Sequence, residues 1–213
     1  MPVSSFLSRL ALATLISLLL AGAVAPDSPI WKTQPTVAEV RGYESDLGSQ
    51  RVPVPSPTSE AAVDPDELRR QCPASRAETL SRRLHFHRPS STLPPARVRY
   101  FAGADSTVHC ISYTWDESHT LSGKQMVKRL SRGGVDPDTV VVRYDMAFDE
   151  IVRVVRSEWG PPDMLDERPI ADTSGANKQY RRHARWTTPE VRVDVTLNVS
   201  LLGGQIQVDQ AFR

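Results

Sequence analysis

Cysteine is scarce in this 213-residue chain, which contains only Cys72 and Cys110. Neither belongs to a C-x-x-C pair, so the sequence lacks the spacing of a paired-cysteine zinc site or of a C-x-x-C redox centre. We predict a structural Cys72–Cys110 disulfide, because an export signal described below places the chain in oxidising conditions. Such a bond would close a loop of about 39 residues and stabilise the fold by roughly 3–4 kcal/mol.

An excess of charge of one sign is also absent. The formal net charge is +1, and 24% of the residues are charged. Removal of the first 23 residues removes Arg9, which leaves 25 basic against 25 acidic residues. This balance excludes a strongly basic nucleic-acid-coating protein and an acidic solvating tail, and we expect no nucleic-acid partner.

The recognised catalytic and cofactor motifs are missing. The sequence contains no G-x-S-x-G and no H-E-x-x-H. A phosphate loop needs glycines at the entry to a helix, whereas Gly133–Gly134 follows an expected helix and Gly203–Gly204 enters an expected strand. His109 and Cys110 are adjacent, so a strand would place them on opposite sides and prevent a Cys–His dyad. We therefore expect no catalytic residues and no cofactor.

Long apolar runs are absent except at the N-terminus. Residues 10–22 carry no charge, Arg9 precedes them, and small residues follow as far as Ala25. These features predict a signal peptide over residues 1–25, cleaved after Ala23 or Ala25. The run is short for about 30 Å of hydrocarbon, and an uncleaved anchor is the alternative. We expect a secreted or periplasmic protein with no membrane span after cleavage.

Proline is abundant in the next part of the chain, where residues 26–95 hold eleven of the 17 prolines. Apolar residues show no sustained period over most of 26–63, which predicts a disordered Pro-rich linker or tether. Trp31 within it is either an exposed docking residue or a part that folds back onto the core. Residues 64–95 are predicted to be a short helical segment, with a capping box at Ser75 and a helix running to Leu84.

Residues 96–213 are predicted to form a compact α+β domain. Apolar residues at a helical period predict a helix over 146–159, and a shorter one over 122–131 is expected to bury Met126, Val127 and Leu130. Alternating patterns predict strands over 97–102, 107–115, 139–144, 178–187, 191–200 and 205–212. The expected fold is an antiparallel sheet of about five or six strands, packed on one face by one long helix and one or two short helices.

Basic and aromatic residues alternate along the strand predicted over 178–187. Tyr180, Arg181, His183 and Arg185 form the candidate binding set in this strand, for an anionic protein or an anionic envelope polymer. The alternative interpretation is that the basic side chains form the ordinary solvent-facing side of a strand.

His85 and His87 suggest a metal site, because residues i and i+2 of a strand lie on the same side and can bind one metal ion. The remaining ligands would have to come from His109, His119, His183 or distant acids, so we expect no metal.

The sequence thus favours a non-catalytic exported binding module. The alternatives are a small exported hydrolase or metal-dependent enzyme that uses His85 and His87, and a small-ligand carrier with a pocket between sheet and helix. Ligand identity, oligomeric state and host stay open.

Overall fold

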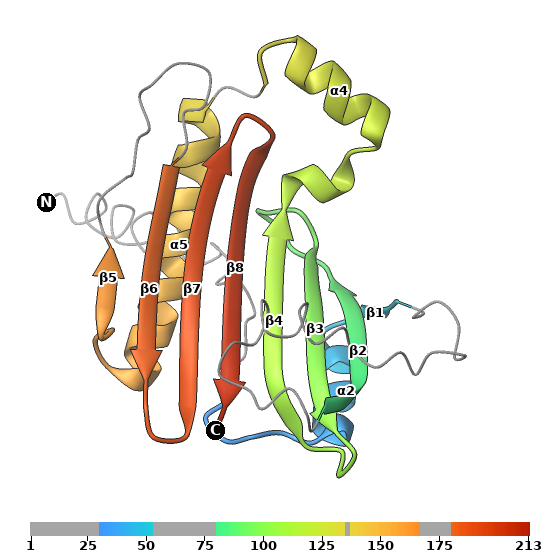
Figure 1. Ribbon diagram of the computed structural model, residues 1–213, viewed down its shortest axis with the longest axis vertical. Coiled ribbons are helices and arrows are strands. Elements are labelled where there is room, and N and C mark those ends of the chain that lie inside the picture. The colour runs from blue at the N-terminus through green and yellow to red at the C-terminus, as the bar shows by residue number, and fades with distance from the viewer. Residues whose placement is uncertain (1–29, 53–79, 135–136, 167–179) are drawn as a thin grey trace, which may run out of the picture.

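The computed structural model describes residues 30–52, 80–134, 137–166 and 180–213. These residues form an α+β fold with one antiparallel sheet of eight strands, in the order β1-β2-β3-β4-β8-β7-β6-β5 (Figure 1). The predicted signal peptide over 1–25, the first part of the helical segment predicted from residue 64, and the capping box at Ser75 lie outside the described residues, as does Cys72.

The strands are β1 (Gln50–Arg51), β2 (Leu80–Arg88), β3 (Ala96–Gly103), β4 (Val108–Asp116), β5 (Met164–Asp166), β6 (Tyr180–Thr187), β7 (Val191–Ser200) and β8 (Gly203–Phe212). The helices are α2 (Val37–Asp46), the 3-10 helix η3 (Glu117–Thr120), α4 (Gly123–Ser131) and α5 (Pro137–Trp159). The strand count exceeds the predicted five or six because β1, β2 and β5 were not expected.

Apolar side chains gather on one face of the sheet, which we call the inner face. Along β7 every second residue from Val191 to Val199 is buried, and the alternate residues are half-buried. Cross-strand pairing continues this face from Val195 to Val208 of β8 and on to Tyr113 of β4. Strand alternation therefore leaves most polar side chains of the long strands on the opposite face.

Helix α5 lies against β7 and β8 on the inner face (Figure 1). Its buried side chains, spaced three and four residues apart, are Val140, Tyr144, Phe148, Ile151 and Val155. The strand predicted over 139–144 is wrong, because Val140 and Tyr144 extend the helical stripe of the helix expected over 146–159. That stripe outweighs the strand preference of the β-branched run in this segment.

Helix α2 replaces part of the predicted disordered linker over 26–63. The Thr36 hydroxyl accepts a hydrogen bond from the backbone N–H of Glu39, and the Glu39 carboxylate accepts one from Thr36 in return. This capping box starts a helix that buries Val37 and Val40. The Trp31 backbone N–H donates to Gln210 Oε1 at 3.1 Å, so Trp31 folds back onto the sheet.

A buried ion pair joins α2 to the inner face. The Glu44 carboxylate accepts hydrogen bonds from Arg88 Nη2 and Ser49 Oγ, each at 2.5 Å, and from the Tyr100 hydroxyl. The Arg88 guanidinium also lies 5.1 Å from the ring centroid of Tyr113. Both charged groups are almost fully buried, and each is hydrogen-bonded to the other. The pair therefore holds α2 against the inner face of the sheet.

Residues 80–88 form strand β2. The helix predicted to run as far as Leu84 is therefore wrong from Leu80 onward. Leu84 and Phe86 are buried in the core, while His85 and His87 point to the other side. The folded unit therefore begins before residue 96, because β1, β2 and α2 belong to it.

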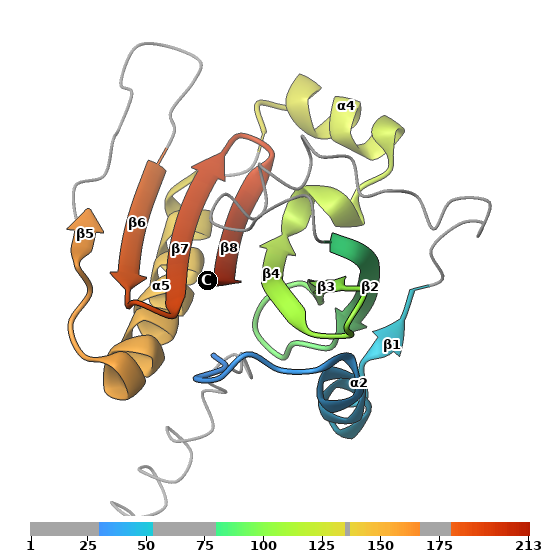
Figure 2. The same ribbon diagram turned by 60° about the horizontal axis from the view of Figure 1, so that its bottom comes forward.

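Helix α4 occupies nearly the predicted range, and Ser122 caps it in a second capping box. The prediction that Val127 and Leu130 are buried is wrong, since they are 68% and 48% exposed. Figure 2 shows the reason: α4 stands apart from the sheet beyond the end of β4. The strands predicted over 97–102, 107–115, 178–187, 191–200 and 205–212 are confirmed within a few residues.

Candidate ligand-binding face

The sheet face opposite α2 and α5 carries most of the binding residues predicted from the sequence, and we call it the polar face. Its side chains form rows across the strands because all neighbouring strands are antiparallel, and the register shifts in β2–β3 and β3–β4 lie outside these rows. One row runs from Arg185 through Asp194, Asp209, Ser112 and Arg99 to His85, and the next runs from Asp166 through His183, Thr196, Gln207, Thr114 and Arg97 to His87.

Asp194 lies at the centre of the sequence-predicted binding set. It accepts hydrogen bonds from His183 Nε2 at 2.9 Å, Arg185 Nε at 2.7 Å and Arg192 Nε at 2.6 Å. Burial acts to raise the pKa of Asp194, but these hydrogen bonds outweigh burial and hold that pKa well below its usual range. We call this group the Asp194 cluster. Its cations already share a carboxylate, which reduces their attraction for a further anion.

The four predicted binding residues do not all meet. Arg181, His183 and Arg185 share the polar face, with Arg181 exposed opposite Asn198. Tyr180 lies on the inner side, where its hydroxyl donates to Asp145 Oδ1 of α5 at 2.7 Å. Arg182 donates to the same oxygen at 2.6 Å, so Tyr180 joins β6 to α5 and does not extend the polar face.

Asp209 lies beside Asp194 in the same row, on β8. Its Oδ2 accepts a hydrogen bond from Gln207 Nε2 at 2.7 Å, while its Oδ1 is buried with no partner among the described residues. Burial raises the pKa of Asp209 to about 7, against the lowering effect of hydrogen bonds from Ser112 and Gln207. The centre of the polar face thus holds a carboxyl group that is poorly disposed to ionise.

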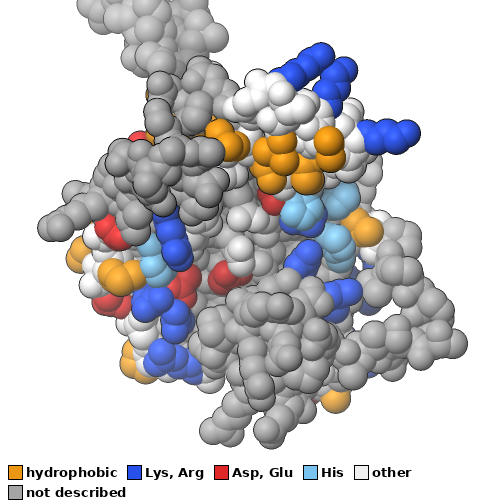
Figure 3. Space-filling model, turned by 45° about the horizontal axis from the view of Figure 1, so that its top comes forward, with side chains coloured by type: hydrophobic (Ala, Val, Ile, Leu, Met, Phe, Trp, Pro, Cys, Tyr) orange, Lys and Arg blue, Asp and Glu red, His pale blue; other side chains and the backbone are white. Residues whose placement is uncertain are grey.

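A second group of basic side chains lies at the other end of the rows. Strands β2 and β3 place five of them on the polar face, which we call the β2–β3 basic cluster: Arg83, His85, His87, Arg97 and Arg99. The rings of His85 and His87 meet edge to face, with centroids 5.4 Å apart. Figure 3 shows histidine, lysine and arginine side chains gathered on this side of the molecule.

The surroundings of His85 show the electrostatic character of this cluster. Burial, and then the charges of Arg99, His87, Arg97 and Arg83, lower the pKa of His85 to about 4. His85 Nε2 is buried and has no hydrogen-bond partner among the described residues. A neutral imidazole among cations indicates a positive potential that a bound anion would relieve.

The β2–β3 basic cluster was missed in the sequence because residues up to Leu84 were assigned to a helix. A signal for it was present: Leu84 and Phe86 alternate with Arg83, His85 and His87. Arg97 and Arg99 likewise alternate with Val98 and Tyr100. When two strands that each alternate basic with apolar residues pair with one another, their basic side chains come to lie side by side on one face.

The metal hypothesis for His85 and His87 gains no support from the geometry. Among the described residues, no group of three or more histidine, cysteine, aspartate or glutamate side chains is arranged to hold a metal ion. The nearby arginine charges that lower the pKa of His85 would also repel a cation. His119 instead pairs with Asp116 of β4 at 2.5 Å.

Cys110 is buried on β4 opposite Phe101, and no described cysteine is a free thiol. Since Cys72 lies outside the described residues, the Cys72–Cys110 pairing stays a prediction. Within the described residues, no helix has both the length and the apolar character needed to cross a bilayer.

Comparison with protein-family models, with curated proteins and with solved structures finds no match for this chain. The geometry of the polar face therefore has to carry the functional interpretation.

Proposed function

We propose that this chain is an exported, non-catalytic binding protein that holds an anionic polymer on the β2–β3 basic cluster. The cover given to the inner face by α2 and α5 leaves the polar face as the side for recognition. The observation that carries the proposal is the convergence of Arg83, Arg97 and Arg99 on His85 across two paired strands.

The charge pattern favours this cluster over the set predicted from sequence. In the Asp194 cluster, one carboxylate accepts bonds from two arginines and a histidine. In the β2–β3 basic cluster, four basic side chains act on His85, while the acidic groups that act on Arg97 and Arg99, Asp116 and Asp209, belong to β4 and β8. Arginine suits phosphate and carboxylate groups because its planar guanidinium presents several N–H donors in a fixed fork.

The test is the anisotropy of fluorescently labelled inorganic polyphosphate, titrated with the mature chain from Val24. Arg97→Gln/Arg99→Gln should weaken binding at least tenfold, because it removes two cations from the cluster. Arg181→Gln/Arg185→Gln is the matched control, since it removes the same charge from β6, at the other end of the polar face.

Thermal unfolding of each variant verifies that it is folded before binding is compared. Equal loss of affinity in both double variants would place the anion elsewhere on the polar face. No binding of polyphosphate, and none of a polyglutamate probe, would contradict the proposed function.

A further inference from the structure

Helix α4 has a side that the rest of the described fold leaves uncovered. Val127 and Leu130 are the most exposed aliphatic side chains of this helix, at 68% and 48%. Lys124 and Lys128, four residues apart, lie about 60° and 100° around the helix on one flank of Val127, and Leu130 lies about 60° to the other side of it. The uncovered side of α4 therefore carries two aliphatic side chains, bordered on the Val127 flank by two lysines.

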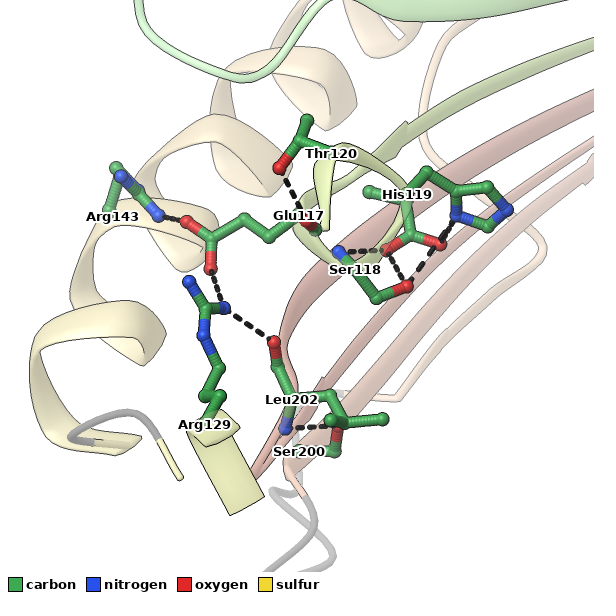
Figure 4. A network of polar contacts seen from close by, with 9 residues as sticks. Glu117, Ser118, His119, Thr120, Arg129, Arg143, Ser200 and Leu202 are labelled. Carbon is green, nitrogen blue, oxygen red and sulfur yellow. Dashed lines mark hydrogen bonds and ion pairs between the residues drawn. The ribbon is translucent and has the colours of Figure 1, made fainter. Parts of the chain in front are cut away.

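The opposite side of α4 is anchored to the body of the protein. Arg129 Nη1 donates to the backbone oxygen of Leu202 at 2.8 Å and lies 3.9 Å from Glu117 Oε2 of η3 (Figure 4). Glu117 also pairs with Arg143 of α5, which ties α4 to the long helix. Since Arg129 lies about 200° around the helix from Val127, the anchor turns Val127 outward.

The charge around this surface has one sign. Residues 121–134 contain four basic residues and no acidic one: Lys124, Lys128, Arg129 and Arg132. The carboxylate of Glu117, which contacts α4 through Arg129, is also engaged by Arg143. Figure 3 shows the result, with hydrophobic side chains on α4 bordered by lysine and arginine side chains.

We propose that α4 docks on an anionic lipid bilayer, with Val127 and Leu130 entering the headgroup region and Lys124 and Lys128 contacting lipid phosphates. An apolar stripe with a basic rim is the pattern of interfacial helices. Two aliphatic side chains are too few for a stable protein interface, which typically buries about 800 Å² on each partner. The position of α4, apart from the sheet, lets a planar surface reach it.

Docking through α4 would orient the rest of the molecule. The hydrophobic side chains of α4 and the histidines and arginines of the polar face appear on the same side of the molecule in Figure 3. A bilayer bound by α4 would therefore keep the polar face close to the membrane surface.

The test is co-sedimentation of the mature chain with phosphatidylcholine vesicles, with and without phosphatidylglycerol. Binding is expected only with phosphatidylglycerol. Lys124→Gln/Lys128→Gln should weaken it on the order of thirtyfold, as each lysine near an anionic surface strengthens binding about fivefold. Arg41→Gln/Arg156→Gln is the control, because it removes the same charge from exposed sites on α2 and α5.

The apolar contribution is tested with Val127→Asp/Leu130→Asp, which should abolish vesicle binding. Met164→Asp, which places a charge on a partly exposed apolar residue of β5, should leave it unchanged. Absence of binding to phosphatidylglycerol vesicles, or equal losses in the α4 variants and their controls, would overturn the proposal.

These outcomes are independent of the proposed function. The α4 variants should bind polyphosphate with wild-type affinity, and failure of polyphosphate binding leaves the vesicle result unaffected. Retained polyphosphate binding also shows that the α4 variants are folded.

Discussion

At the scale of single residues, Asp209 is the most unusual titrating group of the polar face. Burial raises its pKa to about 7, above the value near 4 of a carboxyl group in an unfolded chain. Between about pH 4 and pH 7 the folded protein keeps this proton and the unfolded chain loses it. The contribution of Asp209 to stability therefore falls as pH rises through this window.

We predict that Asp209→Asn stabilises the protein relative to wild type at pH 8 and has little effect near pH 4. The amide cannot ionise, so the buried charge that forms in wild type above about pH 7 never forms in the variant. The measurement is the difference in melting temperature between variant and wild type from pH 4 to pH 8.

The variant has to be compared with wild type at each pH, because the titration of His85 changes the stability of both proteins in the opposite direction. Its pKa is lowered to about 4 from an unfolded value near 6.5, so its contribution to stability rises between these two pH values. Asp194→Asn serves as the control: it should destabilise at neutral pH, since the pKa of Asp194 is lowered. A pH-independent effect of Asp209→Asn would contradict the raised pKa.

At the scale of elements, the contact between α5 and the sheet depends on one glycine. A Cβ atom at Gly204 would collide with the ring of Tyr144, which is fully buried between α5 and β8. Gly204 therefore allows the helix to approach the β7–β8 hairpin closely.

We predict that Gly204→Ala lowers the free energy of unfolding by about 1–3 kcal/mol, because the added methyl group overpacks the interface. Gly42→Ala is a matched control in α2, where nothing lies within 4 Å of the added Cβ. It should be neutral or raise stability by up to about 1 kcal/mol through helix propensity. Urea unfolding of both variants measures these changes, and equal effects would show that α5 does not pack as described.

The elements that sequence predicted well are those whose own pattern is long and regular. The alternation from Val191 to Val199 and the stripe from Phe148 to Val155 each repeat over several turns or pairs. Helix α2 was missed because one of its buried positions is Glu44, a charged residue whose partners Arg88 and Tyr100 are distant in sequence. Strand β2 was missed for a similar reason, since its pairing with β3 overrides the helical pattern that was extended as far as Leu84.

On the polar face too, patterns within one strand were predicted correctly, whereas contacts between strands were not. Alternation alone placed Arg181, His183 and Arg185 on one side of a strand, and the structure agrees. The neutralising role of Asp194 depends on the register between β6 and β7, which spacing within one strand does not specify. The β2–β3 basic cluster likewise arises only when two strands pair.

At the scale of the whole molecule, the predicted Cys72–Cys110 disulfide would join the segment before β2 to the centre of the sheet. We expect no labelling of the native protein by iodoacetamide before reduction and labelling of both cysteines after it. Reduction, or Cys110→Ser, should lower the free energy of unfolding by roughly 3–4 kcal/mol. Labelling of either cysteine in the unreduced protein would contradict the pairing.

The hydrogen bonds between Trp31 and Gln210 join residues that are 179 positions apart, and the bridge between Thr36 and Thr107 adds a second distant pairing. Contacts of such wide separation slow folding, because a large loop must close before they form. The N-terminal segment can dock completely only after β8 has been synthesised. During synthesis, therefore, the emerging chain lacks β8 and cannot complete this fold, and an incompletely folded chain is what the export proposed above would require.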